Sequence, residues 1–153
     1  MKSIRANRQC FNPFARTASI FLIAAGMGGC GMFGGSDAKQ PMRASAENTS
    51  GEGTVEATRD KNGNVDIEVL VQHLSTPSKV ESDASVYVVW LQPNNAEIQN
   101  LGALKVDDDL VGTFNSTTPH SSFELSITPE PSARMSAPTH DAVFSSVVAL
   151  NDE

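Results

Sequence analysis

From Gly53 onward, apolar residues recur at every second position of the chain. The clearest example is Val65–His73, where apolar residues at 65, 67, 69 and 71 alternate with polar residues at 66, 68 and 72, and Leu70 breaks the polar side. Asn62-Gly63 lies directly before this segment, and Asn-Gly is the strongest short-range hairpin signal. Because successive side chains of a strand point to opposite faces, the pattern predicts antiparallel strands with one buried and one solvent-exposed face.

The same pattern, bounded by turn residues, predicts seven strands. They lie at Thr54–Arg59, Val65–His73, Ser85–Gln92, Ile98–Val106, Leu110–Asn115, Phe123–Ile127 and Ala142–Leu150. Ser85–Gln92 is apolar on both faces, which predicts a central strand with Trp90 in the core. Gly102 predicts a bulge, and Pro129–Thr139 is too rich in proline for a core strand. We therefore expect an all-β fold, an antiparallel immunoglobulin-like β-sandwich of about seven strands.

The N-terminal segment has a different character. Its four basic residues, Lys2, Arg5, Arg8 and Arg16, have no acidic residue among them, and an apolar run follows at Ala18–Met27. A transmembrane helix needs about 20 apolar residues, and this run is about half as long. A basic start, a short apolar stretch and small residues after it indicate a secretory signal peptide.

The end of this signal, Met27-Gly28-Gly29-Cys30, resembles the lipobox of bacterial lipoproteins. The resemblance implies cleavage after Gly29 and lipidation of Cys30, whose sulfur accepts a diacylglycerol. The alternative is an ordinary signal peptide with a chance cysteine at the cut. In the family, an aspartate after the cysteine can retain the protein in the inner membrane. Gly31 at that position implies an outer-membrane location, facing the periplasm or the cell surface.

These signals divide the chain into three parts. We expect a signal peptide at 1–29, the lipidated cysteine with a flexible linker at 30–52, and a β-sandwich domain at 53–153. Gly31–Glu52 is rich in Gly, Ser and Ala without sustained periodicity, which predicts a tether. A short strand near Ala44–Ala46 is the alternative.

The charge and cysteine content limit the functions of the exported part. Of 11 basic residues, 4 lie in the signal, so 7 basic and 18 acidic residues remain, a formal charge of −11. Such an acidic domain is unsuited to nucleic acid, whose phosphates require Lys and Arg. Cys10 lies in the signal, and Cys30 is the only other cysteine, so neither an internal disulfide nor a thiolate metal site is expected.

An ordered series of short motifs covers about Tyr87–Val148. It contains Tyr87-Val88-Val89-Trp90-Leu91, Leu101-Gly102-Ala103-Leu104, Leu110-Val111-Gly112-Thr113-Phe114, Thr128-Pro129-Glu130-Pro131 and Ala137-Pro138-Thr139. The series resembles the periplasmic C-terminal domain of anti-sigma-K-type factors, and small bacterial lipoproteins that carry this domain alone. The cytoplasmic sigma-binding domain and transmembrane helix of those factors have no counterpart here, so the resemblance implies the fold and not sigma-factor control.

Candidate chemical groups are few. His73, His120 and His140 have no second ligand at metal-binding spacing, and Asp107–Asp109 suggests either a Ca²⁺ loop or a solvated turn. Glu124 and Glu130 are either paired carboxylates or, as we expect, one strand residue facing water and one loop residue. Trp90 is either a sugar-stacking residue or, as we expect, part of the core. The triplets Asn48-Thr49-Ser50 and Asn115-Ser116-Thr117 match the glycosylation pattern by chance.

No catalytic, cofactor-binding or metal-binding set is therefore expected. The sequence predicts a non-enzymatic, lipid-anchored envelope protein, held to the membrane through Cys30, with an envelope protein or glycan as its partner. The alternatives are a periplasmic ligand- or metal-binding sensor module, based on Asp107–Asp109 and the histidines, and a hydrolase with an unrecognised site.

Overall fold

The computed structural model describes residues 37–45 and 51–151, which form nine strands and one short helix. These elements are β1 (Asp37–Ala44), β2 (Glu52–Arg59), β3 (Val65–Gln72), α1 (Pro77–Val80), β4 (Val86–Pro93), β5 (Gln99–Ala103), β6 (Lys105–Val106), β7 (Gly112–Thr118), β8 (Ser122–Glu130) and β9 (Phe144–Ala149). The expectation of an all-β fold is confirmed. Among the described residues no helix has the length and apolar character needed to cross a membrane.

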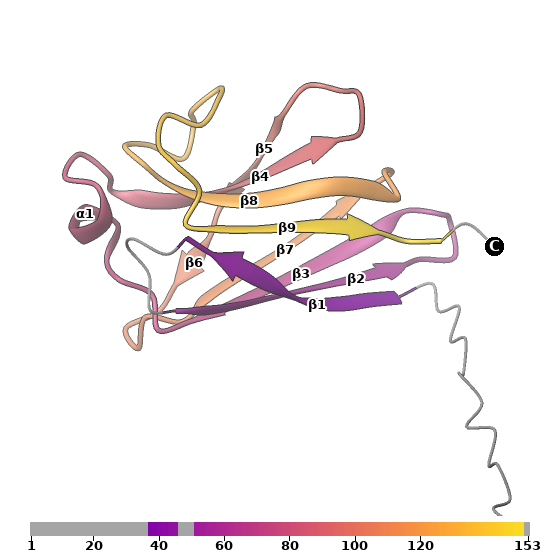
Figure 1. The fold of residues 1–153 in the computed structure, drawn as a ribbon, viewed down its shortest axis with the longest axis horizontal. Helices are drawn as coiled ribbons and strands as arrows, with labels where there is room; N and C mark the ends of the chain where they lie inside the picture. The colour runs from indigo at the N-terminus through magenta and orange to yellow at the C-terminus, as the bar shows by residue number, and fades with distance from the viewer. Residues whose placement is uncertain (1–36, 46–50, 152–153) are drawn as a thin grey trace, which may run out of the picture. The chain divides into compact units, whose positions relative to one another are not determined.

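All neighbouring strands pair antiparallel in the order β5-β4-β8-β9-β1-β2-β3-β7-β6. β1 connects the two halves of the sheet. Its residues Asp37–Met42 pair with β2, while Arg43 and Ala44 pair with β9. The half containing β4, β5, β8 and β9 consequently faces the half containing β2, β3, β6 and β7 (Figure 1). The count of nine strands corrects the expected seven.

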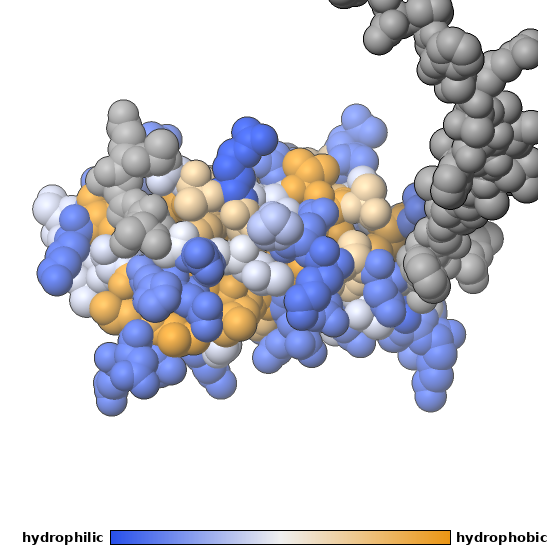
Figure 2. Space-filling model, turned by 60° about the horizontal axis from the view of Figure 1, so that its bottom comes forward, coloured by the Kyte–Doolittle hydropathy of each residue, from blue (hydrophilic) through white to orange (hydrophobic). Residues whose placement is uncertain are grey.

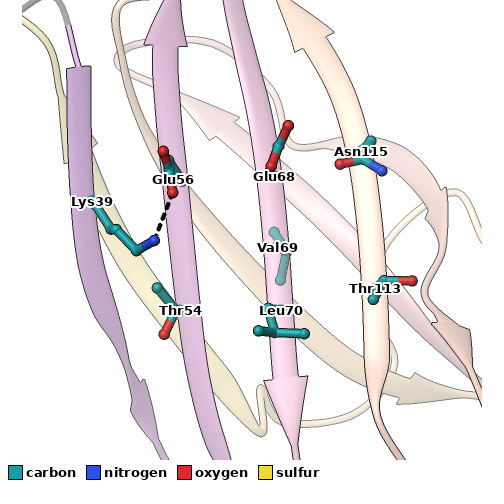
Figure 3. Close-up of a pocket in the computed structure, with 8 residues that line it drawn as sticks. All are labelled: Lys39, Thr54, Glu56, Glu68, Val69, Leu70, Thr113 and Asn115. Carbon is teal, nitrogen blue, oxygen red and sulfur yellow. Dashed lines mark hydrogen bonds and ion pairs between the residues drawn. The ribbon is translucent and has the colours of Figure 1, made fainter.

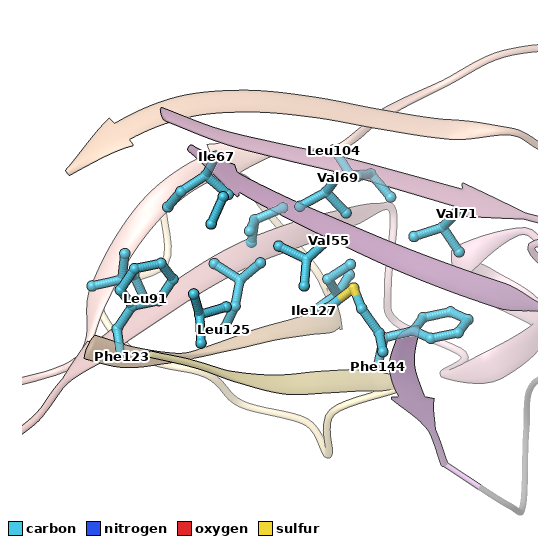
Figure 4. Packing of buried hydrophobic residues seen from close by; sticks show 14 of the residues in the cluster. Val55, Ile67, Val69, Val71, Leu91, Leu104, Phe123, Leu125, Ile127 and Phe144 are labelled. Atoms are coloured by element: carbon cyan, nitrogen blue, oxygen red, sulfur yellow. The ribbon is translucent and has the colours of Figure 1, made fainter. Parts of the chain in front are cut away.

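The core lies between the two halves. In β3 the odd-numbered residues are buried and the even-numbered ones exposed, as the alternation predicted. They meet apolar side chains of the facing half, among them Leu91, Leu125 and Phe144 (Figure 4). The predicted hairpin is also present: Gly63 has φ 86°, and the Asp60 carboxylate accepts hydrogen bonds from the backbone N–H groups of Asn62 and Asn64, both at 2.8 Å.

β1 contradicts the expected flexible linker over residues 37–44. Only one of its side chains, Met42, is buried, so its sequence carries no apolar alternation. Pro41, which lacks an N–H, is tolerated because backbone pairing with β9 begins only at Arg43. The Gln40 side chain connects this unpaired part of β1 to β9, because its Nε2 donates a hydrogen bond to Ser146 Oγ at 2.7 Å.

Replacing Met42 with alanine should therefore lower the free energy of unfolding by about 2–5 kcal/mol, the usual range for a buried methionine. Met42 is 6% exposed and belongs to the main core cluster. Urea unfolding followed by circular dichroism measures the change, and Arg43→Ala at the exposed neighbouring position is the control. Equal stability of the two variants would show that β1 does not belong to the core.

Two further expectations need correction. The segment Ile98–Val106, expected as one strand, forms β5 and β6, which pair with β4 and β7 at opposite ends of the strand order. Its predicted bulge is confirmed, because Gly102 has φ 127° and the β4–β5 register shifts beside it. β8 runs through Pro129 to Glu130, contrary to the expected loop. Pro129 fits because pairing with β9 has already ended at Ile127.

Candidate functional site

The outer side of β4 and β8 carries a second buried layer, separate from the main core. Tyr87, Val89 and Leu91 belong to the core cluster, whereas the intervening Trp90 points the other way and is still 0% exposed. The segment 131–143 lies against this side, since Asn100 of β5 donates hydrogen bonds to its backbone at Ala133 O (3.0 Å) and Met135 O (2.7 Å). The expectation of a buried Trp90 is confirmed, and a sugar-stacking role for it is excluded.

A chain of buried hydrogen bonds runs from Trp90 to the far end of β8. Trp90 Nε1 donates to Thr128 Oγ1 at 2.8 Å, and Thr128 Oγ1 donates to Glu130 Oε1 at 2.6 Å. The Glu130 side chain, also 0% exposed, accepts two more bonds from Thr139: N–H to Oε1 at 3.0 Å, and the hydroxyl to Oε2. Through these bonds Glu130 fastens segment 131–143 to the end of β8.

These bonds determine the charge of Glu130. Burial raises the pKa of the carboxyl, but hydrogen bonds from Thr128 and Thr139 and the neighbouring His140 together outweigh it, so the pKa lies below its ordinary 4.5. The group is ionised at neutral pH. In the described part of the chain no buried side-chain nitrogen or oxygen lacks a partner. The network is therefore fully satisfied, the condition under which buried polar groups make a fold more rigid.

His140 extends the network to the surface. Its Nδ1 lies 3.2 Å from Thr139 Oγ1 and 4.0 Å from Glu130 Oε2, and its Nε2 lies 3.1 Å from Asp83 Oδ1. Asp83 and Glu81 lie in the turn between α1 and β4. One ligand atom from each of Glu81, Asp83 and His140 falls within 4.8 Å of the others. No other group of three or more His, Cys, Asp or Glu residues is so arranged in residues 37–45 and 51–151.

The other predicted candidates lie apart from this cluster. His73 and His120 are not among its members. Glu124 pairs with Gln92, and Glu130 pairs with Val86 at the other end of β4. The two carboxylates therefore lie apart. The expectation for Glu124, on the exposed side of its strand, is confirmed, and the expectation of a loop position for Glu130 is wrong.

Asp107 has a structural role in its turn. Its Oδ1 accepts hydrogen bonds from the backbone N–H groups of Asp109 at 3.0 Å and Val111 at 2.8 Å. The carboxylate thus stabilises the β6–β7 turn, in which Leu110 has φ 60°. Asn115-Ser116-Thr117 lies within β7, whereas Gly29, Cys30 and the triplet at Asn48 lie outside the described residues.

A shallow groove of about 400 Å³ lies on the outer face of the other half of the sheet (Figure 3). Lys39 Nζ is 2.8 Å from Glu56 Oε2, and Glu56 stands directly opposite Glu68 on the next strand. The hydrogen bond and charge of Glu56, with the charge of Glu68, raise the Lys39 pKa against the opposing effect of burial. Leu70, 43% exposed, adds an apolar contact surface to this groove.

Hydrophilic side chains predominate on the face drawn in Figure 2, and hydrophobic residues lie between them in separate areas.

Sequence reasoning missed Thr139 as a partner of Glu130, and missed Glu81 and Asp83 altogether. Only the Thr-Pro-Glu-Pro and Pro-Thr motifs indicated the pair of Glu130 and Thr139.

In comparisons with known proteins, no protein-family model and no curated protein sequence matches this chain.

Proposed function

We propose that this chain is a lipid-anchored, non-catalytic protein of the bacterial cell envelope. Its β domain, an immunoglobulin-like sandwich in this proposal, acts by presenting a surface to an envelope protein or glycan. The carrying observation is the lipobox-like Met27-Gly28-Gly29-Cys30 at the end of a signal-like segment. More than one acyl chain on Cys30 would make the attachment stable, since each buried methylene contributes about 0.8 kcal/mol.

The position of β1 shortens the tether that this proposal requires. Seven peptide units join Cys30 to Asp37, where β1 begins. Fully extended, they span at most about 25 Å. A lipidated Cys30 would therefore keep the start of β1 close to the membrane. A partner would have to lie in the same membrane or reach the domain there.

The polar groups of the domain support a binding role over a catalytic one. Glu130 is held ionised by three hydrogen bonds from Thr128 and Thr139, which leaves it unsuited to exchanging protons near neutral pH. The groove beside Lys39 and Glu56 offers a polar, partly apolar surface instead. The formal charge of −11 for the exported part disfavours nucleic acid as its partner.

The resemblance to the extracytoplasmic domain of anti-sigma-K-type factors gains support from one structural point. Trp90, Thr128, Glu130 and Thr139, drawn from three separate motifs of the series, are joined in a single hydrogen-bond chain. Residues that share one structural role would recur together in a family. Sigma-factor control is not part of the proposal, because the motifs that carry the resemblance belong to the extracytoplasmic domain of those factors.

Labelling cells with a clickable palmitate analogue tests the anchor. The wild-type protein should carry the label and sediment with the outer membrane, a location favoured by Gly31. Cys30→Ala should lose the label and the membrane association, because no other exported cysteine is present. Cys10→Ala is the matched control and should behave as wild type. Label on Cys30→Ala, or wild-type protein released with a free thiol, would refute the proposal.

A further inference from the structure

The tautomer of the His140 ring is set by its neighbours. Thr139 has a single hydroxyl proton, which it donates to the ionised Glu130 carboxylate. The hydroxyl oxygen is then an acceptor, so we assign the proton on His140 Nδ1 to the 3.2 Å contact with it. In the neutral imidazole, Nε2 would consequently carry the lone pair.

That lone pair points at a carboxylate oxygen. Nε2 lies 3.1 Å from Asp83 Oδ1, and Glu81 offers a carboxylate oxygen within 4.8 Å of one ligand atom of each of these two residues. Each of the three groups offers an electron pair, and the two carboxylates also reach solvent. A proton on Nε2 satisfies Asp83 alone. A divalent cation would satisfy all three groups.

The distances suit a small transition-metal ion. A tetrahedral site with metal–ligand bonds of about 2.0–2.1 Å has ligand–ligand separations of about 3.3 Å. The separation of His140 Nε2 and Asp83 Oδ1 is 3.1 Å, and the widest in the cluster is at most 4.8 Å. Glu81 and Asp83 retain exposed surface, so rotation of their side chains can close the remaining gap.

We propose that Glu81, Asp83 and His140 bind one Zn²⁺ ion, with water completing the coordination. An imidazole with two carboxylates suits Zn²⁺, whereas Ca²⁺ takes six to eight oxygen ligands and no nitrogen. The site joins the α1–β4 turn to segment 131–143. It depends only on the described residues, and holds whether or not Cys30 is lipidated.

The buried network supplies the supporting shell that metal-bound histidines need. A ligating histidine normally donates its other N–H to an oxygen that fixes the ring orientation. Here Thr139 accepts that proton and is itself held by Glu130, which Thr128 and Trp90 hold in turn. Thr139 and Glu130 are thus positioning residues, and His140 is presented with its Nε2 outward.

The test is a titration of the full-length protein, purified in detergent and stripped with EDTA, with Zn²⁺ in competition with a chromophoric chelator. The wild type should bind one equivalent, and His140→Gln and Asp83→Asn should each weaken binding at least tenfold. Thr139→Val, which keeps the shape but loses the hydroxyl, should weaken binding by about tenfold or more. Zn²⁺ should raise the melting temperature of the wild type but not of His140→Gln, whose cooperative melting shows that it is folded.

Two control variants separate this site from general surface binding. His120→Gln removes a different loop histidine, and Asp141→Asn removes an exposed carboxylate next to His140. Both should bind Zn²⁺ as the wild type does. The proposal is overturned if the wild type binds no Zn²⁺, if His140→Gln binds it as well as the wild type, or if the controls weaken binding as much as the cluster variants.

Discussion

Trp90→Ala should lower the free energy of unfolding by about 3–5 kcal/mol, the largest effect expected of any single substitution in this protein. The ring is 0% exposed between β4 and segment 131–143, so its removal leaves a cavity that rigid strands cannot fill. It also removes the N–H that Thr128 accepts at 2.8 Å. Because Trp90 is the only tryptophan, unfolding in urea must be followed by far-ultraviolet circular dichroism.

Two comparisons set the scale of this effect. Trp90→Phe keeps one six-membered aromatic ring but loses the rest of the indole with its N–H, so it should destabilise the fold by less than Trp90→Ala. Val147→Ala, at a position 66% exposed on β9, should change stability by less than about 0.5 kcal/mol. If Trp90→Ala unfolded at the same urea concentration as Val147→Ala, segment 131–143 would not cover the ring.

Glu130→Gln should lower the free energy of unfolding by about 1–3 kcal/mol, although the substitution nearly preserves shape. The carboxylate accepts three hydrogen bonds, and an amide offers one acceptor oxygen and two N–H donors. The amide keeps all three contacts only if the Thr139 hydroxyl turns to accept from its NH2 group, and bonds to a charged acceptor, worth about 1.5–3 kcal/mol, then become neutral bonds worth about 0.5–1.5 kcal/mol. Glu124→Gln is the matched control on the exposed face of the same strand and should be nearly neutral.

The same variant should change the response to acid. The pKa of Glu130 in the folded protein lies below the ordinary 4.5, because the hydrogen bonds from Thr128 and Thr139 outweigh the effect of burial. Its contribution to stability is therefore complete above about pH 4.5, the value for the unfolded chain, and is lost as the pH falls through the folded value. Melting temperatures measured from pH 7 downward should fall less steeply below pH 4.5 for Glu130→Gln than for Glu124→Gln. Parallel curves would mean that Glu130 carries no depressed pKa.

The elements that the sequence predicted share a local cause. The alternation of β3, the Asn62-Gly63 hairpin and the double-sided apolarity of β4 arise from neighbouring residues, whose side-chain directions the strand geometry sets. Gly102 likewise predicted a bulge, and in the structure it has a φ of 127°, a conformation that favours glycine. For these elements, propensity and burial lead to the same conformation.

The errors lie where the pairing of strands outweighs the local sequence pattern. β1 is polar and contains Pro41, yet pairing with β2 over six residues makes it a strand. Pro129 seemed to exclude a strand, but β8 pairs with β9 only as far as Ile127. Pairing with β9 therefore does not need the N–H that proline lacks. Ile98–Val106 looked continuous, and its two parts joined different strands. In each case the backbone pairing of the strands, which side-chain alternation does not reveal, decided the conformation.

The sequence alone determined that this chain forms antiparallel strands and which faces of β3 and β4 are buried, because side-chain alternation is a local property. Only the tertiary structure decided that β1 joins the sheet, and that Glu130, expected in a loop, is a buried carboxylate. It also brought His140 to Asp83, which lies 57 positions earlier in the chain. The reason is physical: a hydrogen bond or a metal ligand depends on distance in space, and only the folded chain sets the distance between residues far apart in sequence.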